Sequence, residues 1–131
     1  MTWSCTYCAP IIRLRISCAL GGILNSASIP ELNCSIVAGS ANNQLLDRSD
    51  GELLHRRGVV YVPDYAANAG GVINISCEID REYNEDLAWE KTALIGDTVA
   101  EILNRSAATN KPTSWVADVM AEELFKLEVL A

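Results

Sequence analysis

GELLHRRGVVYVPDYAANAGGVINISCEI, residues 51–79, is the stretch that decides the fold of this chain. Residues 59–62 at its centre are β-branched or aromatic, which is typical of a strand, and Pro63 cannot continue a central strand. Residues 50–57 have a helix-forming composition, and Gly58 then stops the helix. The stretch therefore predicts a helix that leads directly into a strand.

The flanking sequence extends this pattern in both directions. Residues 35–38 form a short apolar run ending at Gly39, which predicts a buried strand upstream, so the order strand, helix, strand indicates an α/β unit with parallel strands. From about residue 68 the pattern is helical, and a last helix, in which Glu122 can pair with Lys126, follows a break at residues 109–112. The apolar positions expected to share helical faces are Tyr83, Leu87, Leu94, Ile95, Val99, Ile102 and Leu103, then Val116, Val119, Met120, Leu124 and Leu127. The predicted fold class is α/β, a partial Rossmann-like nucleotide-binding domain with few parallel strands, followed by long C-terminal helices.

Composition narrows the function classes. The chain has 131 residues, of which half are hydrophobic, so it can bury the core of one domain. Its 17 acidic residues against 10 Lys and Arg give a net charge of -7, which argues against general binding to nucleic acid or anionic membranes. No apolar run reaches the ~18 residues of a spanning helix, and Arg13 and Arg15 interrupt the one early stretch that resembles a signal peptide. Five cysteines, an odd number, favour reduced thiols, so we expect a cytoplasmic protein.

Three features that suggest chemistry have simpler explanations. Cys5 and Cys8 have CxxC spacing, but neither a second ligand pair nor a strand-to-helix context accompanies them, so the spacing is read as incidental. His55, the only histidine, lies in the predicted surface helix, where a solvated or capping role is favoured over catalysis. The acidic residues between 78 and 90 lack the ligand spacing and central glycine of a calcium loop. None of the three predicts a site.

Amides and glycines after the predicted strands are more informative. Asn42, Asn43 and Gln44 follow the strand at 35–38, and Asn68 precedes a Gly-Gly pair. Amide side chains both donate and accept hydrogen bonds, so they match a carboxamide or a carboxylate beside an amine. Open α/β sheets place ligands where strands end, and glycines allow close backbone approach. This neutral, glycine-rich wall favours a nucleotide cofactor, although tight turns and close packing would explain the glycines equally well.

Two common cofactor motifs are missing. The chain contains neither GxGxxG nor GxxxxGK[ST], so the usual phosphate-binding turns are absent from it. Its three lysines, Lys91, Lys111 and Lys126, belong to the helical C-terminal part, away from the amide loops. A lysine acting as general base beside the ligand is therefore hard to place.

The motifs CALGGILN, IVAGSANNQL, GELLHRRGVVYVPDYAANAGGVINISCEI and REYNEDLAWEKT occur in this order from residue 18. In these motifs the chain resembles the C-terminal part of the glutamate/leucine/phenylalanine/valine dehydrogenase family, nearest to leucine and valine dehydrogenases. The resemblance implies NAD as cofactor and the reversible deamination of an L-amino acid to a 2-oxo acid and ammonia. It also implies self-association into a homo-oligomer, because the family often ends in helices used for subunit contacts.

The resemblance also implies roles for individual residues. Those implied to bind the cofactor are Cys18, Ala19, Asn42 and Asn68, and those implied to bind the substrate are Asn43, Val72 and Ile75. The backbone of residues 18 and 19 would lie beside the nicotinamide ribose, and Asn43 would face the substrate carboxylate. Two aliphatic residues in the side-chain pocket suit a branched aliphatic amino acid.

The chain also departs from the family pattern. The family has proline directly before Cys-Ala-Leu-Gly-Gly, where this chain has Ser17. We therefore divide the chain into residues 1–17, which do not match, and residues 18–131, the C-terminal part of an NAD-binding dehydrogenase domain. The family's catalytic lysine and aspartate belong to a substrate domain that this sequence lacks, so no catalytic acid or base is assigned.

Two hypotheses remain open from the sequence. The first is a fragment of an NAD-dependent dehydrogenase acting on a branched-chain amino acid such as leucine or valine, inactive by itself. The second is a non-catalytic interaction or assembly module, or an inactivated remnant of the same family. Lineage and activity are separate questions, so the two are compatible.

Overall fold

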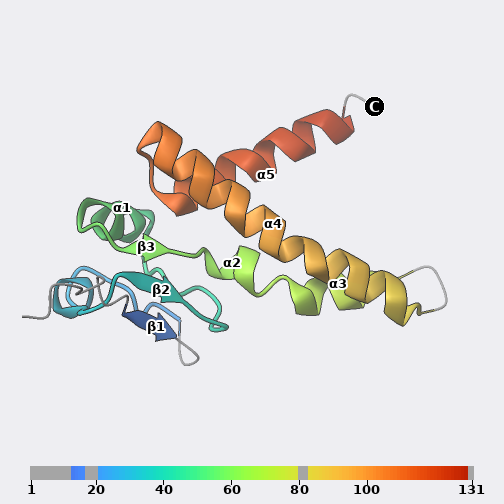
Figure 1. Cartoon of the computed structure of the whole chain (residues 1–131), viewed down its shortest axis with the longest axis horizontal. Coiled ribbons are helices and arrows are strands. Elements are labelled where there is room, and N and C mark those ends of the chain that lie inside the picture. The colour runs from blue at the N-terminus through green and yellow to red at the C-terminus, as the bar shows by residue number, and fades with distance from the viewer. Residues whose placement is uncertain (1–12, 17–20, 80–82, 130–131) are drawn as a thin grey trace, which may run out of the picture.

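The computed structural model describes residues 13–16, 21–79 and 83–129, which form a small parallel sheet and a set of helices (Figure 1). The sheet has the order β1-β2-β3, with β1 at Leu14–Ile16, β2 at Ile36–Ala38 and β3 at Val60–Tyr61. Both pairings are parallel, and Ile36 lies between Leu14 and Val60 in the register. The strands predicted at 35–38 and 59–62 are thus present in shorter form, and β1 comes from the segment for which no structure was predicted.

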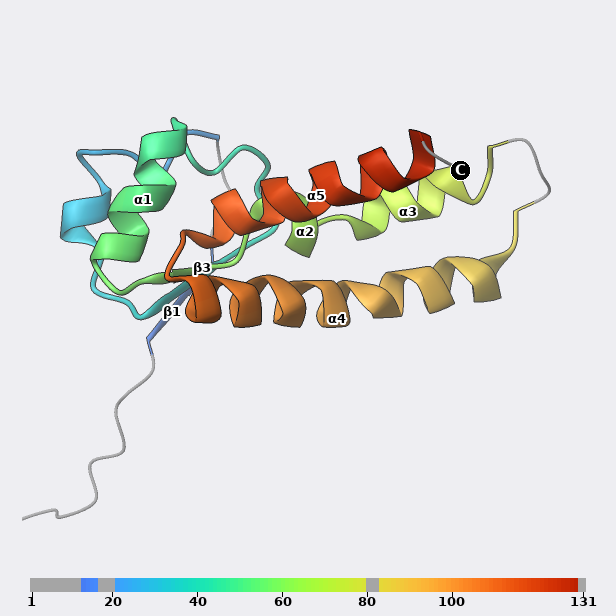
Figure 2. The same ribbon diagram turned by 90° about the horizontal axis from the view of Figure 1, so that it is seen from above.

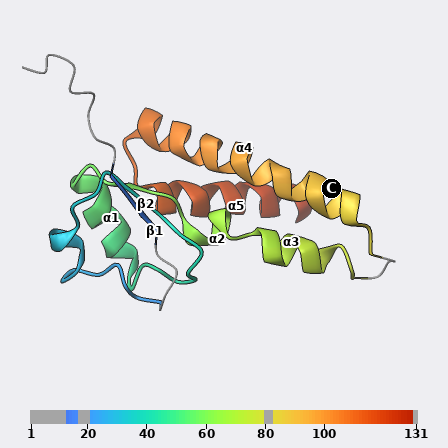
Figure 3. The same cartoon turned by 60° about the horizontal axis from the view of Figure 1, so that its bottom comes forward.

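The helices follow the predicted order. They are the 3-10 helix η1 at Ile29–Glu31, α1 at Arg48–Arg56, α2 at Asp64–Ala67, α3 at Gly70–Ser76, α4 at Glu85–Thr109 and α5 at Thr113–Val129. Helical structure begins four residues earlier than expected, at Asp64, and a break at Asn68 separates α2 from α3. Helix α4 runs alongside both α5 and α3 (Figure 2). The strands and α1 form one end of the molecule, and α3, α4 and α5 extend away from it (Figure 3).

Local chemistry explains where the helices begin and end. The backbone N–H of Asp47, before α1, donates to the Asp50 carboxylate at 2.9 Å, and Gly58 after α1 has a φ of 68°. The Asn84 side chain accepts from the N–H of Leu87 at 3.0 Å and caps α4. Helix α4 ends at Thr109 and is followed by Asn110, whose φ of 52° is left-handed. The glycine stop predicted for α1 is confirmed.

The core has two parts, one under the sheet and one between the long helices. The buried residues of the first are Leu24, Ile29, Leu32, Val37, Leu54, Val59 and Tyr61, and those of the second are Ile102, Val116 and Ala117. Further along the same helices, Leu94 is 58% exposed and Leu124 64% exposed, although both were expected to share an apolar helical face. The predicted faces are therefore covered near the sheet and open towards the far ends of the helices.

The difference between core and open helix face gives a stability test. We expect Leu54→Ala to lower the free energy of unfolding by about 2–5 kcal/mol, because Leu54 is fully buried beneath the sheet. The matched change Leu94→Ala, on an exposed helical position, should alter it by less than about 0.5 kcal/mol. Urea unfolding followed by circular dichroism measures both, and equal losses would show that α1 does not pack as described.

Candidate functional site

The loops that follow β2 and β3 meet at the carboxyl edge of the sheet. The side-chain amide of Asn68, at the end of α2, donates to the side-chain oxygen of Asn42 at 2.9 Å and to the carbonyl of Ser40 at 3.0 Å. Both asparagine side chains are exposed. The structure thus brings together two of the residues implied to bind the cofactor, from segments 26 residues apart.

Asn43 next to this pair has an unusual backbone. Its φ of 54° is left-handed, a conformation that is uncommon for residues other than glycine but that asparagine adopts more often than most. Its N–H donates to the Asp64 carboxylate at 2.6 Å, and its carbonyl accepts from the N–H of Gly22 at 2.7 Å. A Cβ at Gly21 would lie 3.2 Å from the Asn43 carbonyl oxygen, so the close approach of these two segments favours glycine there. The backbone of Asn43 is held on both sides while its side chain stays exposed.

The buried residue Asp64 binds the backbone of the loop that carries Asn43. It is 6% exposed, and its second carboxylate oxygen accepts from the Tyr61 hydroxyl at 2.6 Å. Burial of Tyr61, together with this hydrogen bond, raises the pKa of the phenol well above its usual range. The hydroxyl of Thr113, at the start of α5, donates to the Tyr61 carbonyl at 2.6 Å. Sequence reasoning missed Asp64, although an acid directly after a strand-ending proline was a signal for it.

Gln44, the third amide of the loop, does not face the same way. Its side chain is fully buried, and its amide nitrogen donates to the carbonyls of Gly39 at 3.0 Å and Ala41 at 2.9 Å. Its side-chain oxygen has no hydrogen-bond partner within the described part of the chain. Gln44 therefore fixes the turn after β2, whereas the two asparagines before it are exposed.

The other implied site residues divide into two groups. Val72 and Ile75 lie one turn apart on α3 and are 72% and 60% exposed, so they form an open apolar face shortly after Asn68. Cys18 and Ala19 lie outside the described residues. The structure therefore describes five of the seven implied residues and all five are exposed: the three asparagines in the loops after β2 and β3, and the two aliphatic residues on α3.

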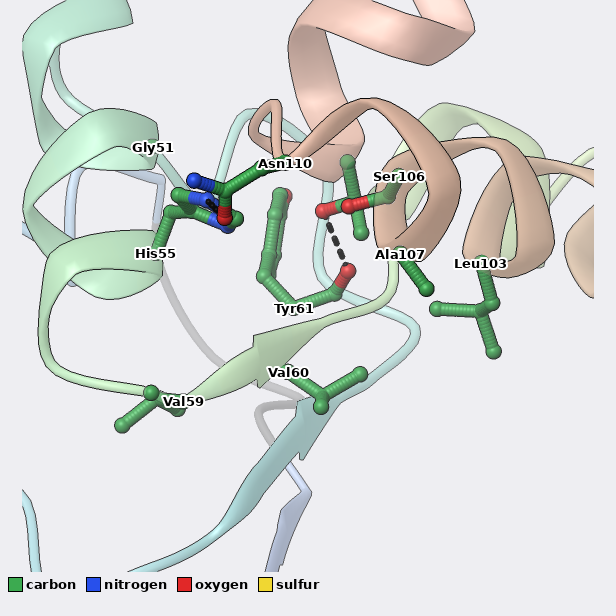
Figure 4. A pocket seen from close by; sticks show the side chains of 11 residues that line it. Gly51, His55, Val59, Val60, Tyr61, Leu103, Ser106, Ala107 and Asn110 are labelled. Atoms are coloured by element: carbon green, nitrogen blue, oxygen red, sulfur yellow. Dashed lines mark hydrogen bonds between the residues drawn. The ribbon is translucent and has the colours of Figure 1, made fainter.

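His55 lies at another place, beside the free edge of β3. It lines a cavity of about 470 Å³ together with Val60, Leu103 and Thr113 among other residues, and Asn42, Asn43 and Asn68 are not part of that lining. Its ring nitrogen Nε2 is 3.2 Å from the side-chain oxygen of Asn110 (Figure 4). This contact joins the end of α1 to the turn between α4 and α5, which is a structural role.

Other site classes find no support in the described residues. They contain no group of three or more His, Cys, Asp or Glu side chains placed to hold a metal ion. Cys34 and Cys77 are free thiols, while Cys5 and Cys8 lie outside the described residues. No described helix is long and apolar enough to cross a membrane.

Comparison with known proteins decides the lineage. The model of the glutamate/leucine/phenylalanine/valine dehydrogenase family matches residues 10–114. The chain belongs to this family. The matched range includes β1 and the loops that carry Asn42, Asn43 and Asn68, so the amide cluster lies within the part of the chain that family members share.

Individual relatives agree with this membership. The chain is 45% identical to leucine dehydrogenase from Geobacillus stearothermophilus over 106 residues, which cover 81% of this chain and 29% of that protein. It is 40% identical to phenylalanine dehydrogenase from Thermoactinomyces intermedius, covering 84% of this chain and 30% of that protein. The crystal structure of L-tryptophan dehydrogenase from Nostoc punctiforme superposes with a TM-score of 0.80 at 40% identity, covering 85% of this chain and 34% of that structure. The predicted family and α/β fold class are confirmed, and the chain spans about 30% of the length of these dehydrogenases.

The pH dependence of stability tests the buried hydrogen bond between Tyr61 and Asp64. Because its folded pKa lies above the unfolded value of about 10, the protonated phenol stabilises the fold fully below pH 10, and this contribution is lost as pH rises further. Above pH 10, we expect the free energy of unfolding to fall more steeply with pH in the unchanged chain than in Tyr61→Phe. The difference between the two slopes should reach about 1.4 kcal/mol per pH unit.

Urea unfolding at a series of alkaline pH values measures this slope. The control is Tyr83→Phe, which removes the hydroxyl of an exposed tyrosine and should keep the steep slope. Parallel slopes for the unchanged chain and Tyr61→Phe would contradict the buried hydrogen bond between Tyr61 and Asp64.

Proposed function

We propose that this chain forms the nicotinamide and substrate side of an NAD-dependent L-amino-acid dehydrogenase. The reaction is the oxidative deamination of a branched-chain amino acid, such as leucine or valine, to the 2-oxo acid and ammonia. The observation that carries the proposal is the joined pair Asn42 and Asn68, exposed where two parallel strands end. Family membership and the relatives named leucine dehydrogenase support it.

The residues present fit a nicotinamide. Its carboxamide needs a donor and an acceptor together, which an asparagine side chain offers in one group. The exposed side chains of Asn42, Asn43 and Asn68 are neutral. Gly21 allows its own segment to pass close to the backbone of Asn42 and Asn43. When bound, NAD supplies the acceptor for the hydride that leaves the substrate α-carbon. The chain's own residues bind and orient the two reactants.

Each residue then has a distinct task. Asn42 and Asn68 bind the nicotinamide end, and the backbone of Cys18 and Ala19 lies beside its ribose. Asn43 donates from its exposed side chain to the substrate carboxylate. Val72 and Ile75 form one wall of the substrate side-chain pocket, and their aliphatic surface favours a branched side chain over a charged one. Holding both reactants on one rigid edge lowers the entropic cost of the hydride transfer.

The proposal extends to the setting of the enzyme. Residues 18–131 form the C-terminal part of its NAD-binding domain, and the enzyme acts in the cytoplasm, where the free thiols Cys34 and Cys77 stay reduced. The enzyme is a homo-oligomer, and the exposed Leu124 and Phe125 on α5 support burial of this helix against another surface.

The dehydrogenase fragment and the alternative, a non-catalytic module, make the same prediction for the isolated chain. We expect the purified 131 residues to show no leucine-dependent reduction of NAD and at most weak NADH binding. The reason is that the chain contains no phosphate-binding glycine turn, and its three lysines lie outside the amide loops. Absorbance of NADH measures the activity, and robust turnover would contradict this expectation.

A chimera separates a working site from a remnant. We expect leucine-dependent NAD reduction to persist when the matching 106 residues of the leucine dehydrogenase from Geobacillus stearothermophilus are replaced by those of this chain. In this chimera, Asn68→Ala should lower kcat/KM by about tenfold or more, the equivalent of one lost hydrogen bond. The matched control Asn104→Ala, an exposed position on α4, should leave kcat/KM unchanged.

An inactive but folded chimera would favour the remnant or module. An active chimera that tolerates Asn68→Ala would instead refute the role of the asparagine pair. Steady-state kinetics with leucine, valine and NAD distinguish the two results.

A further inference from the structure

Asn43 has a left-handed backbone with a φ of 54°. Asparagine adopts this conformation more readily than most residues, as Asn110 does after α4, so the angle alone does not mark a site. What distinguishes Asn43 is that its backbone is hydrogen-bonded in both directions. The restraint here is visible on both sides of the residue. Gly22 donates its N–H to the Asn43 carbonyl at 2.7 Å, and the Asp64 carboxylate accepts the Asn43 N–H at 2.6 Å.

Of these two partners, Asp64 is the one whose side chain makes the contact. A carboxylate that accepts from a backbone N–H forms a stronger bond than a neutral acceptor does. Asp64 itself cannot move freely, because the Tyr61 hydroxyl donates to its other oxygen at 2.6 Å and both residues are buried. The Asp64 N–H also donates to the Tyr61 oxygen at 3.3 Å, so the carboxylate has a fixed orientation.

Helix α2 connects this restraint to the asparagine pair. The helix has four residues, with Asp64 at its start and Asn68 directly after its end. Asp64 binds the backbone of Asn43, and Asn68 binds the side chain of Asn42, so the same helix holds two consecutive residues of the loop after β2. Any shift of α2 relative to that loop changes both contacts together.

We propose that Asp64 is a positioning residue, whose buried carboxylate fixes the left-handed backbone of Asn43 and so orients the exposed amides of Asn42 and Asn43 towards the reactants. Its role in the reaction rests on the proposed dehydrogenase function. Asp64 touches neither reactant in this proposal; it acts through the backbone of Asn43. Orientation of this kind is what hydride transfer between two bound molecules requires.

The chain contains a matched pair for comparison. The Tyr65 hydroxyl donates to the Asp118 carboxylate at 2.9 Å, which repeats the contact between Tyr61 and Asp64 away from the asparagine loop. Asp118→Asn therefore removes the charge from a carboxylate bonded to tyrosine without touching Asn43. The side chain of Asp118 is 40% exposed and also pairs with Arg48 at 3.1 Å, so its replacement controls for the loss of a charge and of a tyrosine contact. A loss of stability is read separately, from the melting temperature of each variant.

The first experiment uses NMR on the full 131-residue chain. In the unchanged chain we expect the strong NOE between HN and Hα of Asn43 that a positive φ gives, and slow exchange of its amide. Asp64→Asn should speed this exchange about tenfold, and Asp64→Ala more, because the asparagine oxygen can still accept from the Asn43 N–H while its amide donates to Tyr61. Asp118→Asn should change neither signal. An Asn43 that keeps both signals in Asp64→Ala would overturn the proposal.

The second experiment uses the leucine dehydrogenase chimera described above. We expect Asp64→Asn to lower kcat about tenfold and Asp64→Ala about 100-fold, while KM for NAD changes less than about threefold, because the rest of the enzyme still binds the cofactor. Asp118→Asn should keep both constants. All rates are measured well below the melting temperature of the least stable variant.

The two experiments test different parts of the proposal, so their results can be told apart. If Asn43 loosens in Asp64→Ala but kcat is unchanged, the role of Asp64 in the reaction is wrong although its contact is real. If the chimera is inactive with Asp64 intact, the proposed dehydrogenase function is wrong, and the NMR result alone then decides whether Asp64 holds Asn43.

Discussion

The parallel pairing of β2 and β3 is the constraint on which the rest of the structure depends. Val60 donates its N–H to the Ser35 carbonyl and Val62 to the Val37 carbonyl, both at 2.9 Å. Because the two strands run in the same direction, their carboxyl ends lie side by side, and so do the loops that follow them. Asn42 and Asn68 meet for this reason, although neither belongs to a strand. Helix α1, packed beneath the sheet, connects the two strands and keeps them in this order.

The buried carboxylate of Asp64 lies directly behind the exposed amide loop. Asp64 has both carboxylate oxygens hydrogen-bonded, the condition under which a protein tolerates a buried carboxylate. The Tyr61 hydroxyl and the Asn43 N–H meet this condition, and they tie β3 to the loop after β2. The hydrogen bonds that compensate for the burial of Asp64 also fix the backbone of Asn43. The structural role of Asp64 and its proposed positioning role thus depend on the same contacts.

The helical half of the chain shows how much apolar surface the described residues leave open. Val72 and Ile75 on α3 and Leu124 and Phe125 on α5 are all more than half exposed. Exposed apolar surfaces of this size commonly mark contacts with ligands or other protein surfaces. The chain also spans only about 30% of the length of its relatives. No other described part of the chain covers these faces.

The sequence by itself determined the family, the fold class and the positions of the main elements. The strand around Val60, the glycine stop at Gly58 and the two long helices follow from local propensity, which is a property of neighbouring residues. The family was recognisable because its motifs occur in a fixed order along the sequence. The sequence also marked Asn42, Asn43 and Asn68 as a group, because parallel strands carry their loops to one edge.

Only the tertiary structure decided how the site is held together. The bond between Asp64 and Asn43 joins residues 21 positions apart, and that between Thr113 and Tyr61 joins residues 52 positions apart. No local pattern specifies such contacts, because they depend on how the strand pairing and the packing of α5 align in space. The inward turn of Gln44 and the exposure of Leu94 were equally invisible, since burial depends on which surface meets the helix or loop.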